Sequence, residues 1–181
     1  MRTLPLRLLL IFAALFASVA NANDNTADSP KLYVVVETFE PIAFENLRQG
    51  RKESGDLVLG TLRNTATASA EFTKLPDQVV ILDEKEKAPE NAPVLRLTWT
   101  DGRGTVAAEL IENGKKYNLG IVSREPLLSH PDYNRLKRQL DMAAMQADAR
   151  HDAVVRTETE MNLYAALKAV AHRRARIAAG K

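Results

Sequence analysis

The stretch that decides the fold is Val94-Leu95-Arg96-Leu97-Thr98-Trp99-Thr100, in which apolar and polar residues alternate. A period of two is that of a strand with one buried face, because successive side chains point to opposite sides of a sheet. Leu95, Leu97 and Trp99 are therefore predicted to face the core. For Trp99, this packing role is favoured over a platform on which a ligand could stack.

Two more strands are predicted downstream, at residues 105–111 and 116–122. The turns between the three strands fall at 101–104 and 112–115. The second turn centres on an Asn-Gly pair, which tight hairpins prefer because both residues tolerate a positive φ. The last strand is expected to place three apolar side chains on one face, those of Tyr117, Leu119 and Ile121. The region is thus predicted to be a three-stranded antiparallel meander.

Upstream of the meander, the sequence predicts a strand–helix–strand unit. Residues 31–39 read as a strand, and the unbroken apolar run at 33–36 suggests an inner position with both faces buried. Residues 77–82 read as a second strand, followed by a charged linker at 83–93. Residues 57–72 have apolar positions at helical spacing but also a glycine and many threonines, so helix and strand both remain open.

The C-terminal segment, residues 131–179, is predicted to be a long helix, since neither proline nor glycine occurs between Pro131 and Gly180. One straight helix would reach about 60–70 Å, so it either bends back near 150–157 or projects past the sheet. The half that begins at Met161 is rich in alanine. We therefore expect that half to hold weakly to the domain, to be available to a partner, and to be dispensable for folding after Glu160. The predicted fold class is α+β.

The N-terminal residues 1–22 have the features of a cleavable export signal. Arg2 and Arg7 precede an apolar run at 8–19 that is much shorter than the ~20 residues a membrane-spanning helix needs. The run ends in Ala20-Asn21-Ala22, so cleavage is expected after Ala22, ahead of a polar spacer at 23–30. The sequence therefore predicts a periplasmic protein, with secretion as the alternative, whose mature part comprises a sheet domain at 31–130 and the helical segment.

Charge and cysteine content exclude several classes of function. The 181 residues include 25 basic and 23 acidic ones, and Arg2 and Arg7 leave with the signal, so the two signs balance in the mature chain. A nucleic-acid-binding protein needs a clear cationic excess. The basic end at 172–181 allows at most peripheral contact with a membrane. No cysteine is present, which removes disulfides, thiol nucleophiles and cysteine-ligated zinc.

Two sets of side chains could carry chemistry, and for both a solvated surface is the favoured interpretation. Acid–base catalysis could use the carboxylates near the end of the first strand, Glu37, Glu40 and Glu45. A metal could use a set on one helical face, Asp148, His151 and Asp152. The Gly-Arg-Gly run at 102–104 lies in a hairpin turn rather than between a strand and a helix. We predict no catalytic residue, no metal ligand and no cofactor.

The layout carries a family resemblance. A strand like residues 32–38, the segment Ala92-Pro93-Val94-Leu95-Arg96-Leu97-Thr98-Trp99 and the later Tyr117-Asn118-Leu119-Gly120 resemble small exported bacterial cell-envelope domains of uncharacterised function. Many of these carry a lipid-modified cysteine after the signal, which this chain lacks. The resemblance implies no catalytic motif.

Three functions are compatible with the sequence. The first is a periplasmic accessory domain that binds another cell-envelope protein and has no catalytic chemistry of its own. The alternatives are a carrier with a small-ligand pocket between the meander and the long helix, and a hydrolase that uses carboxylates. The identity of a partner and the oligomeric state are not encoded in any motif.

Overall fold

The computed structural model describes residues 30–37, 51–83, 85–99, 106–122 and 127–180. Within these ranges the chain forms a five-stranded mixed sheet and three α-helices, so the predicted α+β class is confirmed. The strands are β1 (Lys31–Glu37), β2 (Gln78–Ile81), β3 (Val94–Trp99), β4 (Val106–Glu112) and β5 (Lys115–Val122). The helices are α3 (Arg51–Thr73), α4 (Tyr133–Ala143) and α5 (Ala147–Ala178), with a 3₁₀ turn, η3 (Leu127–Ser129), before α4. The predicted signal at 1–22 and the turn at 101–104 lie outside the described residues.

The strand order in the sheet is β2-β1-β3-β4-β5. β1 pairs in parallel with both β2 and β3, and helix α3 forms the crossover that a parallel β1–β2 pair requires. β3, β4 and β5 pair antiparallel in succession, which confirms the predicted meander. β1 is an inner strand, as predicted. Its residues nevertheless alternate between the two faces, with Leu32 and Val34 buried and Tyr33 and Val35 only partly so, because the described helices cover only one face.

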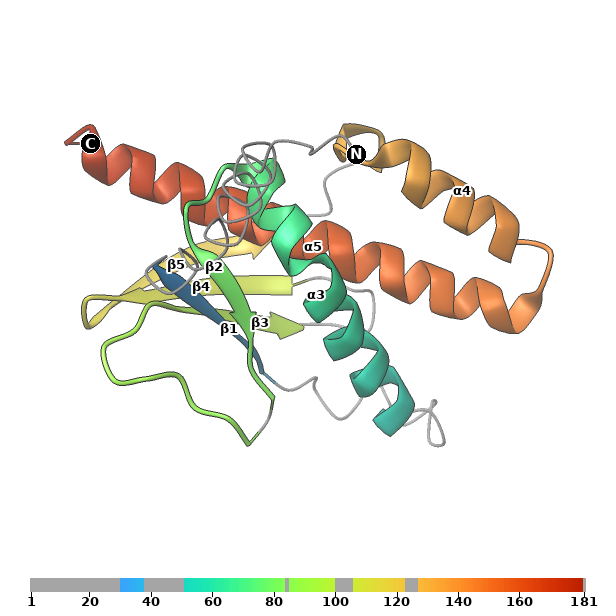
Figure 1. Ribbon diagram of the computed structural model, residues 1–181, viewed down its shortest axis with the longest axis horizontal. Helices are drawn as coiled ribbons and strands as arrows, with labels where there is room; N and C mark the ends of the chain where they lie inside the picture. The colour runs from blue at the N-terminus through green and yellow to red at the C-terminus, as the bar shows by residue number, and fades with distance from the viewer. Residues whose placement is uncertain (1–29, 38–50, 84, 100–105, 123–126, 181) are drawn as a thin grey trace, which may run out of the picture.

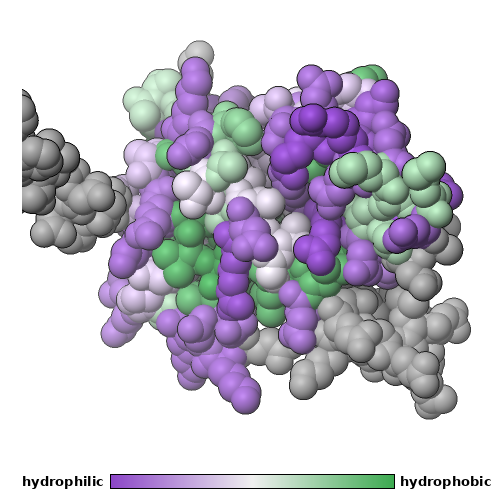
Figure 2. Space-filling model, turned by 45° about the vertical axis from the view of Figure 1, so that its right-hand side comes forward, coloured by the Kyte–Doolittle hydropathy of each residue, from purple (hydrophilic) through white to green (hydrophobic). Residues whose placement is uncertain are grey.

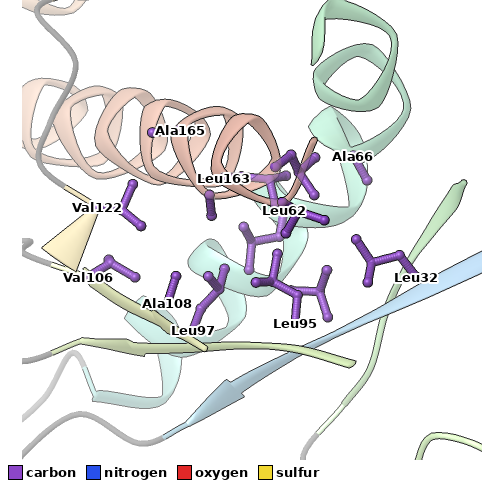
Figure 3. Close-up of a cluster of buried hydrophobic side chains, with 14 of the residues drawn as sticks. Leu32, Leu62, Ala66, Leu95, Leu97, Val106, Ala108, Val122, Leu163 and Ala165 are labelled. Atoms are coloured by element: carbon purple, nitrogen blue, oxygen red, sulfur yellow. The ribbon is translucent and has the colours of Figure 1, made fainter. Parts of the chain in front are cut away.

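Helices α3 and α5 pack together on this one face of the sheet (Figure 1). The core contains side chains from the sheet, from α3 and from α5. Figure 3 shows Leu95 and Leu97 of β3 pointing toward Leu62 of α3 and Leu163 of α5. Trp99 is 7% exposed and belongs to this core, which confirms its predicted orientation. The sheet segment and the C-terminal segment therefore share a single core.

The predicted face of β5 is wrong at one residue. Tyr117 and Leu119 pack against the core, but Ile121 is 63% exposed on the other side. The cause is a shift of register between β4 and β5 at Ala108 and Glu109. An extra residue in one strand changes which side chains face the core beyond that point.

Helix α3 resolves the ambiguity at 57–72 and extends further toward the N-terminus than predicted. It begins at Arg51, ahead of the segment 57–72 in which the sequence left helix and strand open. Its threonines do not disrupt the helix, because the hydroxyls of Thr61, Thr65 and Thr73 each donate to the carbonyl oxygen four residues earlier at 2.7–2.9 Å.

The predicted long C-terminal helix is two helices. The chain turns back at residues 144–146, ahead of the 150–157 bend that the sequence suggested. α5 has 32 residues and is about 48 Å long. It runs back beside α4 and then across the sheet (Figure 1). Among the described residues, no helix has both the length and the apolar composition needed to cross a membrane.

The expectation that the second half of this segment holds weakly to the domain is wrong. Ten of the eleven α5 residues at 157–167 are buried, and Glu158 is the partly exposed one. Leu163, Ala166, Leu167 and Val170 have no exposed surface. The alanines give this half its close approach to the sheet and to α3, since a small side chain lets neighbouring backbones come near.

Candidate functional site

Of the candidate acid–base set, the described part of the chain contains only Glu37. Glu37 lies on β1, and its Oε1 is 2.7 Å from Nε of Arg96 on the neighbouring strand β3. Arg96 also donates to Glu109 of β4 at 2.9 Å. Glu40 and Glu45 lie outside the described residues. Glu37 is thus one end of an ion-pair ladder across three strands, on the sheet face opposite α3 and α5.

The predicted metal set is also not assembled in the part of the chain that the structure describes. Nδ1 of His151 is 3.6 Å from Oδ1 of Asp152, and both side chains are more than half exposed on α5. The side chain of Asp148 lies outside the description. Within the described ranges, no three His, Asp or Glu side chains gather in a way that could hold a metal ion.

A buried polar cluster, which the sequence analysis missed, joins α4 to α5. His130, 3% exposed, precedes α4 and lies between the rings of Phe72 and Tyr164, with ring centroids 6.1 and 5.0 Å away. Its Nδ1 accepts a hydrogen bond from the backbone N–H of Asp132 at 3.1 Å. Its Nε2 is 4.0 Å from Oε1 of Glu160, a buried residue of α5.

Arg135 completes this cluster, which we call the His130–Glu160 cluster: His130, Asp132, Arg135 and Glu160. The Arg135 guanidinium donates to the carboxylates of both Asp132 and Glu160. One residue of the α4 first turn thereby connects the helix start to the middle of α5. The sequence signal that could have located the cluster is a carboxylate on the buried face of a helix, since Glu160 lies four residues before the buried Tyr164.

In this ion pair, the surroundings disfavour the charged form of Glu160 but favour the charged form of Arg135. Burial raises the pKa of the Glu160 carboxyl above its ordinary value, and the attraction of Arg135 opposes this only in part. Burial disfavours the charged form of Arg135 as well, but its contacts with Asp132 and Glu160 outweigh that effect and raise the pKa of its guanidinium. The difference follows from exposure, because the Arg135 side chain is still hydrated while the carboxylate of Glu160 is not.

A consequence for stability can be tested with Glu160→Gln. The folded protein holds a proton on Glu160 more tightly than the unfolded chain does, so the free energy of unfolding falls as the pH rises from the ordinary value of 4.5 through the folded pKa. Glutamine keeps the shape and an oxygen that can accept from Arg135. We expect the variant to be at least as stable as the wild type at pH 7. Its free energy of unfolding should not show the fall with rising pH that Glu160 causes in the wild type, which is at most about 1.4 kcal/mol per pH unit.

Urea unfolding at a series of pH values measures this effect. Asp152→Asn, on the same helix but exposed, is the matched control and should keep the wild-type pH dependence. Strong destabilisation of Glu160→Gln at pH 7 would contradict the expectation, because it would show that the ionised pair stabilises the fold more than burial of the charge costs.

A second charged cluster fixes the basic end of α5. Arg174 donates to Asp77, at the start of β2, and to Glu112, at the end of β4. Burial disfavours its charge, but these hydrogen bonds and ion pairs outweigh that effect and raise the pKa of Arg174. Arg173 lies over the ring of Tyr117 at 4.5 Å. Two bases of the segment 172–181 are thus engaged with the protein itself.

The turn between α4 and α5 presents an exposed apolar surface, which we call the hairpin tip: Met142, Ala144 and Met145. Met142 is 71% exposed and Met145 is 90% exposed. Arg138, Asp141 and Arg150 are exposed next to it in the sequence. The tip lies at the end of the helical pair, away from the sheet (Figure 1). The surface in Figure 2 is largely hydrophilic, with separate hydrophobic patches.

Comparison with known proteins returns no relative: no family model, no curated protein and no solved structure matches this chain.

Proposed function

We propose that this chain is an exported accessory protein without catalytic chemistry of its own, and that it binds another cell-envelope protein through the hairpin tip. The observation that carries the proposal is the exposure of Met142 and Met145 at the far end of the α4–α5 pair. Methionine is flexible and polarizable and is frequent at surfaces that adapt to a partner. Export is supported by the signal-like residues 1–22.

The shape of the arm supports this function. α5 is fixed to the sheet over its second half by the core and by Arg174, whereas its first half extends with α4 beyond the sheet (Figure 1). The tip is therefore presented on a firmly held support. Exposed charges of both signs around it provide a polar rim, which is the usual arrangement at a protein interface.

The two alternative functions receive less support from the packing. A carrier would need a cavity between the meander and α5, but Leu97 and Ala108 face Leu163 there (Figure 3). These three side chains belong to the same core as Leu110 and Leu167, and all five are 2% exposed or less. A carboxylate hydrolase would need a proton-donating carboxyl group near β1. Glu37 there is instead held in an ion pair with Arg96.

A photo-crosslinking residue placed at position 145 tests the proposal in intact cells. We expect one adduct of discrete mass there, and its loss when Met142→Asp introduces a charge into the tip. The matched control is the same crosslinker at Asn64, an exposed position on α3, which should yield no such adduct. The Met142→Asp chain should keep its stability within about 0.5 kcal/mol because the site is exposed. Equal adducts at both positions, or none at 145, would refute binding through the tip.

A further inference from the structure

The hydrogen bond between His130 and Asp132 determines which form of the imidazole the fold accepts. Nδ1 accepts from the Asp132 backbone N–H, so in the docked helix this nitrogen carries no proton. The ring is then neutral, with its proton on Nε2, which is the atom that faces Glu160 at 4.0 Å. His130 is therefore held as one tautomer of the uncharged side chain.

Protonation of His130 would disrupt this arrangement at the start of α4. The added proton goes to Nδ1, where it would point at the Asp132 N–H, so two donors would face one another with no acceptor between them. Asp132 is the N-cap residue of α4, and a cation at a helix N-terminus is unfavourable because the amide dipoles are positive there. The cap has no side-chain hydrogen bond to compensate.

The groups around His130 act on its charge in both directions. From α5, the Glu160 carboxylate attracts an imidazolium, and the hydroxyl-bearing ring of Tyr164 lies edge-on to the imidazole. From α4, Arg135 repels it, while the Asp132 carboxylate is already paired with Arg135. From α3, the apolar ring of Phe72 packs against it. Glu160 is the main opposing group, and it is shared with Arg135.

Helix α4 has few other attachments in the described structure. Leu136 is its one fully buried side chain. Arg135 of the His130–Glu160 cluster connects it to Glu160 of α5. A change at the start of α4 therefore acts on a helix in which a single side chain is buried.

We propose that His130 is a proton-operated latch: the neutral imidazole keeps α4 docked on α5, and its protonation releases the helix. This inference is independent of the proposed function, since it concerns only how α4 is held. A free imidazole takes up its proton near pH 6.5, so acidification through this range favours the released helix, which binds one proton more than the docked one.

Hydrogen exchange read by mass spectrometry tests the latch on the full chain. After correction for the intrinsic exchange rate, protection of residues 133–143 is expected to drop about tenfold from pH 7.5 to pH 5.5. Uptake of one proton changes the equilibrium tenfold per pH unit, and only the part of this interval below about pH 6.5 contributes fully. Peptides from β3 and β4 should keep their protection, which separates release of α4 from global unfolding. His151→Asn, at an exposed histidine of α5, should behave as the wild type.

The decisive variant is His130→Asn. An asparagine Oδ1 can take the place of Nδ1 as acceptor for the Asp132 N–H, and it does not titrate. The variant should keep α4 protected at both pH values. The same experiment in Glu160→Gln removes the opposing carboxylate and its own titration, so release there should be at least as large as in the wild type.

Unchanged protection of α4 in the wild type, or an equal loss in His130→Asn, would overturn the proposal. If His130→Asn does not fold, the ring protons of His130 can be followed by NMR in the wild type. The latch requires the α4 amide signals to change over the same pH range as the ring. Titration of the ring without a change in α4 would refute it.

Discussion

A chain that ends after Glu160 is expected to be unfolded. The truncation removes Leu163, Ala166, Leu167 and Val170, which have no exposed surface in the folded protein. Burial of one leucine or valine side chain contributes about 1.5–3 kcal/mol. Three such losses, with the cavity that they leave, approach or exceed the 5–15 kcal/mol by which a typical domain is stable.

The truncation also removes charged contacts that hold separate elements together. Arg174 is lost with it, and this residue connects α5 to Asp77 at the start of β2 and to Glu112 at the end of β4. Asp77 would then be a buried carboxylate without its guanidinium partner, a change that by itself is strongly destabilising.

Circular dichroism and a thermal melt measure the outcome. The matched control is a chain that ends after Arg176, since residues 177–180 at the end of α5 are exposed. It should melt cooperatively, within a few degrees of the full chain. A cooperative melt of the chain that ends after Glu160 would show that the sheet and α3 fold without α5, which is what the alanine content of the sequence suggested.

The parts of the fold that sequence predicted correctly are those with a local cause. The alternation around Leu95, Leu97 and Trp99 reports one buried face directly, and the Asn-Gly pair specifies a tight turn by its backbone conformation. Asn113 and Gly114 both have positive φ in the structure, at 53° and 70°. Such features require no knowledge of the rest of the chain.

The parts that were missed depend on distant contacts. The turn at 144–146 consists of Ala, Met and Gln, residues that all favour helices, so its position is set by the docking of α4 on α5. An alanine-rich face indicates little burial by area alone, yet here it permits close packing against α3. The His130–Glu160 contact joins residues that are 30 positions apart, and no spacing rule connects them.

The contacts of Glu37 also depend on a residue that is distant in the sequence. Glu37, Glu40 and Glu45 are close in sequence, but Glu37 forms its ion pair with Arg96, a neighbour across the sheet. Strand pairing brings the two together, since Val35 stands beside Arg96 in the β1–β3 register and Glu37 beside Thr98. A sequence window around Glu37 contains none of this information.

The second large effect is expected for Trp99→Ala. Trp99 is the only tryptophan of the chain, lies at the end of β3 opposite Val106, and is 7% exposed in the core. Removal of a buried tryptophan leaves a cavity that the surrounding side chains fill only in part, and the free energy of unfolding should fall by about 3–5 kcal/mol. Urea unfolding followed by circular dichroism measures it, because the variant has lost the fluorescent residue.

Ile121→Ala is the matched control for this substitution. Ile121 lies on β5, in the same meander, but its side chain is 63% exposed because the register shift turns it away from the core. It should change stability by no more than about 0.5 kcal/mol. The pair of variants therefore tests the register as well as the burial. If Ile121→Ala cost as much as Trp99→Ala, the bulge would be misplaced and Ile121 would belong to the core.

If Trp99→Ala cost less than about 1 kcal/mol, the indole would not be part of the core packing, and a role as a stacking platform for a ligand would become the better explanation of that residue.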